Sequence, residues 1–209
     1  ALARPLDMSS ISNFTPLTSS GFTGTFNGLG NTISNLVINS GAESVGLFGQ
    51  VSRGGTVRNI GLLQANVTGT STGIFTAAGG LVGTNNYGTI SDVYATGNVT
   101  SASNGTGGLV GRNFGTISEA YTTGNVTGTS EATGGLVGMS AGSIRDVYAT
   151  GNVTGNSDTG GLVGLNGGTI SEAYATGNVV GDNNTGGLAG RNDDTISGAY
   201  ATGRVTGSD

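Results

Sequence analysis

The residues of this chain with the most evident chemical capacity are four carboxylates that recur at one position of a repeated phrase. They are Asp92, Glu119, Asp146 and Glu172, and Gly198 stands at the same position in the last copy. In neighbouring strands of a parallel sheet, such side chains would lie about 4.8 Å apart. That separation is near the carboxyl spacing of a retaining glycosidase, and oxygen ligands from adjacent strands also suit Ca²⁺.

A structural interpretation of these carboxylates is favoured over either chemistry. Acid catalysis needs two carboxyl groups in different surroundings, whereas a repeat gives every copy the same surroundings. The chain has no His and no Cys, which excludes Ser-His-Asp and Cys-His arrangements. We therefore predict that the chain is not an enzyme and that the carboxylates form a solvated column at a turn, with Arg145 beside them. Calcium binding at this column is the less favoured alternative, and no other cofactor is expected.

The carboxylates belong to a repeat that fills the second half of the chain. Its most regular phrase is Gly-Gly-Leu-Val-Gly. The second glycine recurs after 28, 27, 26 and 26 residues, at Gly80, Gly108, Gly135, Gly161 and Gly187. A Thr-Ile-Ser segment and then a Tyr-Ala-Thr-Gly-Asn-Val-Thr-Gly segment follow, with some variation, and the Thr-Ile-Ser segment can be traced back to Thr32. A fixed period in this range is typical of a stacked repeat architecture.

Residues 90–100 show how one copy would fold. β-branched residues and Tyr dominate this stretch, and apolar residues alternate with polar ones. Val93, Ala95 and Val99 would face a narrow interior, while the polar residues between them would face water. Glycines bracket the segments, as sharp corners require. We predict an all-β fold, a right-handed parallel β-solenoid of about seven coils of roughly 24–28 residues. Each coil would have three short strands, namely the Gly-Leu-Val-Gly strand, the Ile strand and the Tyr-to-Thr strand.

Stacking would turn each repeated position into a ladder of like side chains on the outside of the solenoid. The candidate binding face consists of Thr96, Thr100, Thr123, Thr127, Thr150, Thr154, Thr176, Thr202, Thr206, Asn98, Asn125, Asn152 and Asn178. A candidate aromatic ladder beside it consists of Tyr94, Tyr121, Tyr148, Tyr174 and Tyr200. Val180 and Arg204 interrupt the columns of the binding face. Such ladders are self-complementary in parallel in-register sheets, so stabilisation is the first interpretation.

The first third of the chain departs from the regular phrase. We expect an N-terminal segment or cap over residues 1–20, degenerate first coils over 21–78 and regular repeats over 79–209, all within one solenoid. A longer step between the second and third Thr-Ile-Ser copies predicts a loop near residues 70–78. Five of the six Phe lie in the first part, which suits the covering of a terminal coil. We expect an open edge at the other end, and we interpret the chain as part of a longer protein.

Composition excludes several classes of protein. Only 9% of the residues are charged, and the seven Arg are scattered among twelve acidic residues. A nucleic-acid-binding surface needs a basic patch, so no nucleic-acid partner is expected. No apolar run is long enough to span a bilayer, so no membrane span is expected. The absence of Cys excludes a disulfide framework.

The phrase Gly-Gly-Leu-Val-Gly-x-Asn-x-Gly-Thr-Ile-Ser-x-x-Tyr-Ala-Thr-Gly-Asn-Val resembles the GLUG repeat of large bacterial surface proteins. These proteins are often described as filamentous-haemagglutinin-like. The resemblance covers about residues 21–207. It implies a secreted or cell-surface β-solenoid, located outside the cell, that acts as a stalk or as an adhesive module. The resemblance implies no catalytic residues.

Three functions remain open at this point. The first is an extracellular structural or adhesive repeat module of a larger bacterial surface or secreted protein, whose partner would be a host-cell or matrix surface. The second is ice binding, because a flat, regular, nearly uncharged Thr-x-Asn-x-Thr array resembles the ice-binding faces of β-solenoid antifreeze proteins. The third is glycan binding, with sugar rings stacked on the Tyr ladder.

Overall fold

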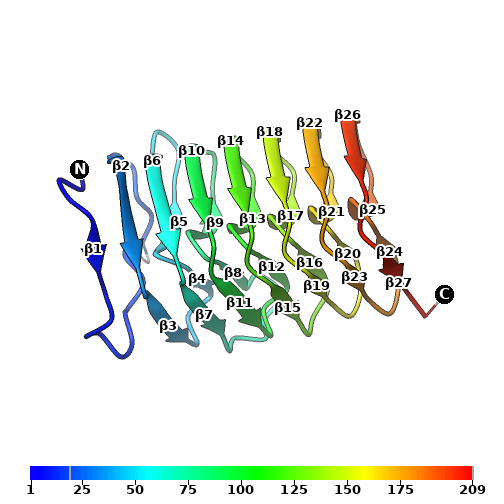
Figure 1. The fold of residues 1–209 in the computed structure, drawn as a ribbon, viewed down its shortest axis with the longest axis horizontal. Helices are drawn as coiled ribbons and strands as arrows, with labels where there is room; N and C mark the ends of the chain where they lie inside the picture. The colour runs from blue at the N-terminus through cyan, green and yellow to red at the C-terminus, as the bar shows by residue number, and fades with distance from the viewer. Residues whose placement is uncertain (19, 209) are drawn as a thin grey trace.

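The computed structural model describes residues 1–18 and 20–208, and in it parallel strands wind into a β-solenoid of about seven turns (Figure 1). Successive turns lie side by side along one axis, and the two termini lie at opposite ends (Figure 1). In the described residues there is no helix long and apolar enough to cross a membrane.

Each full turn contributes one strand to each of four parallel sheets. Sheet 1 contains β1 (Leu6–Asp7), β2 (Thr25–Ser34), β6 (Thr56–Leu63), β10 (Thr89–Ala95), β14 (Thr116–Thr122), β18 (Ser143–Ala149), β22 (Thr169–Ala175) and β26 (Ile196–Ala201). Sheet 2 contains β3 (Val37–Ser40), β7 (Asn66–Gly69), β11 (Asn98–Ser101), β15 (Val126–Gly128), β19 (Val153–Thr154), β23 (Val179–Val180) and β27 (Val205–Thr206). Sheet 3 contains β4 (Ser44–Val45), β8 (Ala77–Gly79), β12 (Gly105–Gly107), β16 (Ala132–Gly134), β20 (Thr159–Gly160) and β24 (Thr185–Gly186). Sheet 4 contains β5 (Phe48–Val51), β9 (Val82–Asn85), β13 (Val110–Asn113), β17 (Val137–Ser140), β21 (Val163–Asn166) and β25 (Ala189–Asn192).

The predicted β-solenoid is confirmed, but a full turn has four strands where we predicted three. The Ile strand and the start of the Tyr strand, which we expected to be separate, form one continuous strand such as β10. The Gly-Gly-Leu-Val-Gly phrase spans two strands, because Gly107 ends β12 and Val110 begins β13. A bend at Gly97 divides the expected Tyr-to-Thr strand between β10 and β11.

Glycines form the corners because no side chain fits there. A Cβ added to Gly107 would collide with the carbonyl oxygen of Val110, and a Cβ added to Gly97 would collide with the backbone of Ala65. A residue larger than glycine at either corner would push adjacent strands apart. The corner glycines therefore set the distance at which successive coils stack.

The predicted alternation of buried and outward residues is confirmed in residues 90–100. Val93, Ala95 and Val99 are buried, whereas Asn98 and Thr100 are exposed. The period of two that places Val99 in the core also turns the polar residue on either side of it toward solvent.

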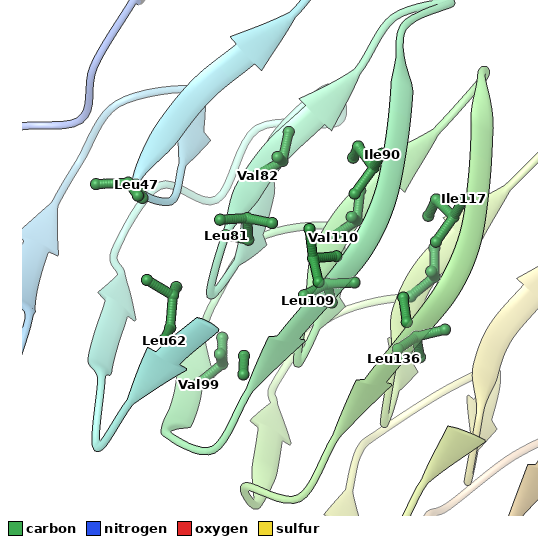
Figure 2. Close-up of a cluster of buried hydrophobic side chains, with 14 of the residues drawn as sticks. Leu47, Leu62, Leu81, Val82, Ile90, Val99, Leu109, Val110, Ile117 and Leu136 are labelled. Atoms are coloured by element: carbon green, nitrogen blue, oxygen red, sulfur yellow. The ribbon is translucent and has the colours of Figure 1, made fainter. Parts of the chain in front are cut away.

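The interior is a continuous column of aliphatic side chains (Figure 2). Leu81, Leu109 and Leu136 come from successive Gly-Gly-Leu phrases and are fully buried. Ile90 and Ile117, on strands of sheet 1, are fully buried as well. Complete burial of one such side chain stabilises a fold by about 1.5–3 kcal/mol. Because every coil supplies the same set, the core is as long as the stack of coils.

The N-terminal residues cover one end of this core. Strand β1 pairs with β2, and Leu17 forms a bridge with Phe48. The rings of Phe22 and Phe26 pack on Phe48, with centroids 5.4 and 5.3 Å apart. The N-terminal segment thus follows the path of the first full coil and shields it from solvent.

At the other end the last coil is only partly covered. Strands β24, β25, β26 and β27 are the terminal strands of their sheets. Val205 is exposed and Ile196 is half-buried, although their counterparts in earlier coils are fully buried. The described residues therefore present an open edge at this end.

One loop is longer than its counterparts. Residues 70–76 connect β7 to β8, whereas residues 102–104 make the equivalent connection between β11 and β12. Ile74 and Phe75, near the tip of the longer loop, are 71% and 70% exposed. The extra residues lie within the range where the sequence indicated an insertion.

Candidate functional site

The Tyr residues form a stacked ladder along sheet 1. Tyr94, Tyr121, Tyr148, Tyr174 and Tyr200 occupy one register position in successive strands. Ring centroids of neighbours are 5.0, 4.7, 4.9 and 5.4 Å apart, and the ring planes are within 10° of parallel. Partial burial raises the pKa of Tyr121 and Tyr148 above the ordinary value, and the neighbouring Tyr hydroxyls add to the rise.

This stacking leaves ring edges, rather than ring faces, open to solvent. The ring of Tyr94 lies directly over Gly61, where an added Cβ would collide with it. The rings of Tyr121, Tyr148 and Tyr174 are each covered on both faces by their neighbours. Tyr200, which is 57% exposed, stacks on one side. Because a sugar ring stacks on an aromatic face, the ladder offers that contact only at its C-terminal end.

The exposed Asn ladder on sheet 2 ties each coil to the next. The Oδ1 of Asn98 accepts a hydrogen bond from the backbone N–H of Asn125, and Asn125 and Asn152 repeat this contact, each at 3.0 Å. Asn178 Oδ1 accepts from the backbone N–H of Arg204, also at 3.0 Å. The hydrogen bonds between coils therefore extend to the backbone of Arg204, although the side chain of Arg204 is not an amide. Each of these amide oxygens therefore accepts one hydrogen bond that joins two coils.

The Thr columns do not form the single flat face that we expected. The bend at Gly97 places Thr96 at a corner and Thr100 on β11 of sheet 2. The same bend recurs in the following coils. The column on sheet 2 extends back to Thr68 and is interrupted at Val180. The flat part of the candidate binding face is therefore two columns wide, one of Asn and one of Thr.

The carboxylate column lies where the strands of sheet 1 bend. The φ angles at this position are 54, 51, 54, 49 and 57° for Asp92, Glu119, Asp146, Glu172 and Gly198. These values belong to the left-handed region, which favours glycine. The pairing register skips this residue in each strand, so it bulges outward and its side chain is exposed.

The surroundings of the carboxylates suit a solvated column. Arg145 Nη1 lies 2.6 Å from Asp146 Oδ2, and both side chains are exposed. Exposed ion pairs contribute at most about 1 kcal/mol. Within residues 1–18 and 20–208, no three His, Cys, Asp or Glu side chains are grouped so that they could hold a metal ion.

A second Asn ladder lies inside the corner between sheet 4 and sheet 1. Asn85, Asn113 and Asn166 are fully buried. Asn85 Nδ2 donates to Asn113 Oδ1 at 2.8 Å, and Asn166 Nδ2 donates to Asn192 Oδ1 at 2.7 Å. Each buried amide also bonds to the backbone of a nearby glycine, as Asn85 does with Gly88. Buried polar groups must be paired, and this ladder pairs both the amides and the corner backbone.

At one outward position of sheet 4 the residue type changes from coil to coil, and some of these residues line a hollow. Successive coils place there Gln50, Thr84, Arg112, Met139, Leu165 and Arg191. At the N-terminal end of this row an open hollow of about 310 Å³ is lined by Glu43, Ser44, Gln50, Phe75, Thr84, Asn86, Arg112 and Phe114. The long loop supplies Phe75, so the insertion forms one wall of the hollow.

Arg112 lies close to both aromatic rings that line the hollow. Its Cζ lies 5.8 Å from the ring centroid of Phe75 and 5.7 Å from that of Phe114. Both distances are within the range of cation–π attraction. The Nη1 of Arg112 donates to the carbonyl oxygen of Ile74 at 3.4 Å. Its Nε is buried and has no hydrogen-bond partner in the described part of the chain.

Sequence reasoning did not identify this hollow. Its lining residues come from three successive coils, and none of them occupies an invariant position of the regular phrase. Two signals pointed to the place: the extra residues near 70–78, and the row in which Gln50, Thr84 and Arg112 differ while neighbouring rows repeat. We had interpreted the first signal as a loop only.

Comparison with known proteins identifies the repeat. A family model described as the GLUG motif matches residues 76–100, 129–154, 155–180 and 181–206. Halomucin from Haloquadratum walsbyi is 46% identical over 91 residues, which is 43% of this chain. The chain spans about 1% of the length of that relative. No solved structure matches the chain. Four stretches of this β-solenoid, over residues 76–100 and 129–206, are therefore matched as GLUG-motif repeats.

Proposed function

We propose that the chain is an extracellular structural repeat module, a rigid spacer within a larger surface or secreted protein, and that it is not an enzyme. The observation that carries this proposal is the engagement of the regular outward ladders in contacts between coils. The Asn98 carboxamide serves the backbone of the next coil, and the Tyr94 ring stacks on Tyr121. The match to the GLUG motif supports the same role, because this chain's repeat resembles the GLUG repeat of large bacterial surface proteins.

Small-angle X-ray scattering tests the spacer role. In a solenoid each repeat contacts only its neighbours, so length should add repeat by repeat. Duplicating residues 129–206, which comprise three matched repeats, should lengthen the particle by about 14 Å, three strand spacings. The radius of its cross-section should stay unchanged. A wider particle, or one that does not lengthen, would rule out the rigid spacer.

We assign the adhesive function, which the resemblance to surface proteins also implies, to surfaces whose residues do not repeat from coil to coil. The ring faces of the inner Tyr residues are covered, which leaves glycan stacking on the ladder to Tyr200 alone. The exposed Asn carbonyl groups already accept backbone hydrogen bonds. We therefore place the recognition of a protein or glycan partner on side chains outside these ladders.

Ice binding is a second candidate function, supported by the register of sheet 2. Asn98 and Thr100 pair in register with Asn66 and Thr68, and the following coils extend the two outward columns as far as Asn178 and Thr154. We rank it second because these columns form a strip only two residues wide. Inhibition of ice recrystallisation that is lost in Thr127→Tyr would support this candidate. Absence of inhibition by the unmodified chain at millimolar concentration would eliminate it.

A further inference from the structure

We propose that the hollow beside Phe75 binds a saccharide, with one sugar ring lying against the aromatic wall. The volume of about 310 Å³ falls at the lower end of the range for small-molecule sites. The proposal goes beyond the spacer role and does not depend on it, because the hollow consists of residues outside the regular ladders.

The apolar part of the hollow suits the C–H face of a sugar ring. Phe75 is 70% exposed, and it lines the hollow together with Phe114. Phe114 lies 6.4 Å from the ring of Tyr87 at a tilt of 38°, so its faces are not stacked as those of the Tyr ladder are. Arg112 lies within 6 Å of both ring centroids, with its Cζ 5.8 Å from that of Phe75 and 5.7 Å from that of Phe114.

The polar part of the hollow suits the hydroxyl rim of a sugar ring. Glu43 offers acceptors only, Arg112 offers donors only, and the amides of Gln50 and Asn86 offer both. Every sugar hydroxyl donates and accepts, so this mixture can pair several hydroxyls at once. The floor is polar but internally paired, because the hydroxyls of Ser44 and Thr84 lie 2.8 Å apart.

Arg112 has unused hydrogen-bonding capacity that a ligand can take up. Within residues 1–18 and 20–208 its guanidinium makes one hydrogen bond, from Nη1 to the carbonyl oxygen of Ile74, and the ion pairs join Arg145 to Asp146 and Arg191 to Asp193 instead. A sugar hydroxyl, or the carboxylate of a uronate, supplies the acceptor that the guanidinium lacks.

The loop that forms the wall is fixed in place by hydrogen bonds. The carbonyl oxygen of Ile74 accepts from Asn104 Nδ2 at 2.9 Å as well as from Arg112. The backbone N–H of Thr76 donates to the carbonyl oxygen of Gly73 at 3.1 Å. Phe75 is therefore presented on an ordered turn, which lowers the entropy lost when a ligand binds.

A second, adjoining hollow gives the saccharide room to continue. It measures about 260 Å³ and is lined by Ala42, Glu43, Ser44 and Gln50, three of which also line the first hollow. A sugar seated against Phe75 can therefore extend past Gln50 as a short oligosaccharide. Later coils carry Met139 and Leu165 in the row of Thr84, and these larger side chains occupy the equivalent space.

Ligand-observed NMR with the whole chain tests the proposal. The probes are methyl glycosides of glucose, galactose, mannose and glucuronate, together with disaccharides of the same sugars, at millimolar concentration. We expect saturation transfer from the protein to at least one of these sugars. Phe75→Ala should weaken that binding about tenfold, because it removes the aromatic contact. Comparison of the neutral sugars with glucuronate shows which acceptor Arg112 takes.

Two further variants separate binding from folding. Ile74→Ala changes the neighbouring residue of the same loop, which is equally exposed but does not line the hollow, and it should bind as the unmodified chain does. Thr84→Leu places in the lining a residue that the fold already accepts at Leu165, and it should abolish binding. Its melting temperature, measured alongside, reports how much the loss of the Ser44–Thr84 hydrogen bond costs the fold. The proposal is overturned if no sugar in the panel shows saturation transfer. It is overturned equally if Phe75→Ala and Thr84→Leu bind as well as Ile74→Ala.

Discussion

Tyr121 and Tyr148 lie face to face, with ring centroids 4.7 Å apart and ring planes 4° from parallel. Tyr148 also stacks on Tyr174, whereas Tyr200 at the end of the ladder stacks on one ring only. Tyr148→Ala should therefore lower the free energy of unfolding by about 2–3 kcal/mol, and Tyr200→Ala by about 1 kcal/mol. Urea unfolding followed by circular dichroism measures both losses. Equal losses would show that the inner stack contributes nothing of its own.

The raised pKa of Tyr121 and Tyr148 predicts a loss of stability in alkaline solution. The unfolded chain ionises its Tyr residues near the ordinary pKa of about 10, whereas the folded chain ionises these two at higher pH. Between the two pKa values the folded state holds more protons. The free energy of unfolding therefore falls as pH rises above about 10, while below that pH these groups add no pH dependence.

Urea unfolding between about pH 8 and about pH 11 checks this slope. Tyr148→Phe keeps the ring and removes the titrating hydroxyl, so the fall in stability should become shallower. A fall as steep in Tyr148→Phe as in the unmodified chain would assign the alkaline sensitivity to other groups.

The left-handed backbone at Glu119 predicts opposite effects for two substitutions. Glu119 has a φ of 51°, and Asn59 adopts the same conformation, with φ of 54°, at the equivalent position of an earlier strand. Glu119→Asn keeps a residue type that tolerates this region and removes a charge beside Asp92 and Asp146. It should raise the free energy of unfolding by up to about 0.5 kcal/mol at low salt, and by less at high salt. Glu119→Val should lower it by about 1–2 kcal/mol, because a β-branched side chain clashes in this conformation.

Thermal unfolding of both variants at low and high salt measures these effects. If Glu119→Val were as stable as Glu119→Asn, the left-handed conformation would not constrain the choice of residue. The carboxylate column would then need another explanation.

The ladders could be predicted from the sequence because they depend on a local pattern repeated in register. The alternation through Val93 and Ala95 decides which side chains enter the core. The fixed period decides which residues pair, as Tyr94 does with Tyr121. The corners were less predictable. A Gly-Gly pair permits a sharp corner without requiring one, and the clash between a side chain at Gly107 and Val110 exists only once the strands are placed.

The candidate site could not be predicted in the same way. Glu43, Phe75 and Arg112 come from three coils and meet only because the coils stack. Periodicity assigns a role to a residue through its copies. Phe75 lies in the longer loop, and the row of Arg112 changes residue from coil to coil. The ladders posed the opposite difficulty, since the sequence placed Asn98 outside but did not reveal that its carbonyl group binds the N–H of Asn125.

The buried Asn ladder has a gap at Ser140, which predicts a stabilising substitution. Asn113 Nδ2 donates to Ser140 Oγ at 3.2 Å, but no hydrogen bond joins the Ser140 side chain to Asn166 in the part of the chain that the structure describes. The corner glycine follows two residues later at Asn113, at Ser140 and at Asn166 alike. An Asn side chain at position 140 therefore meets the same backbone partners as its neighbours do.

Ser140→Asn should raise the free energy of unfolding by about 1–2 kcal/mol, the net value of one or two buried hydrogen bonds. The matched reverse change, Asn113→Ser, should lower it by a similar amount, because it opens a second gap. Asn113→Leu should lower it further, since the N–H of Gly115 that bonds to Asn113 would be left unpaired. Urea unfolding of the three variants measures these differences. A loss of stability in Ser140→Asn would mean that this corner is too narrow for a second amide, and that serine is there for its size.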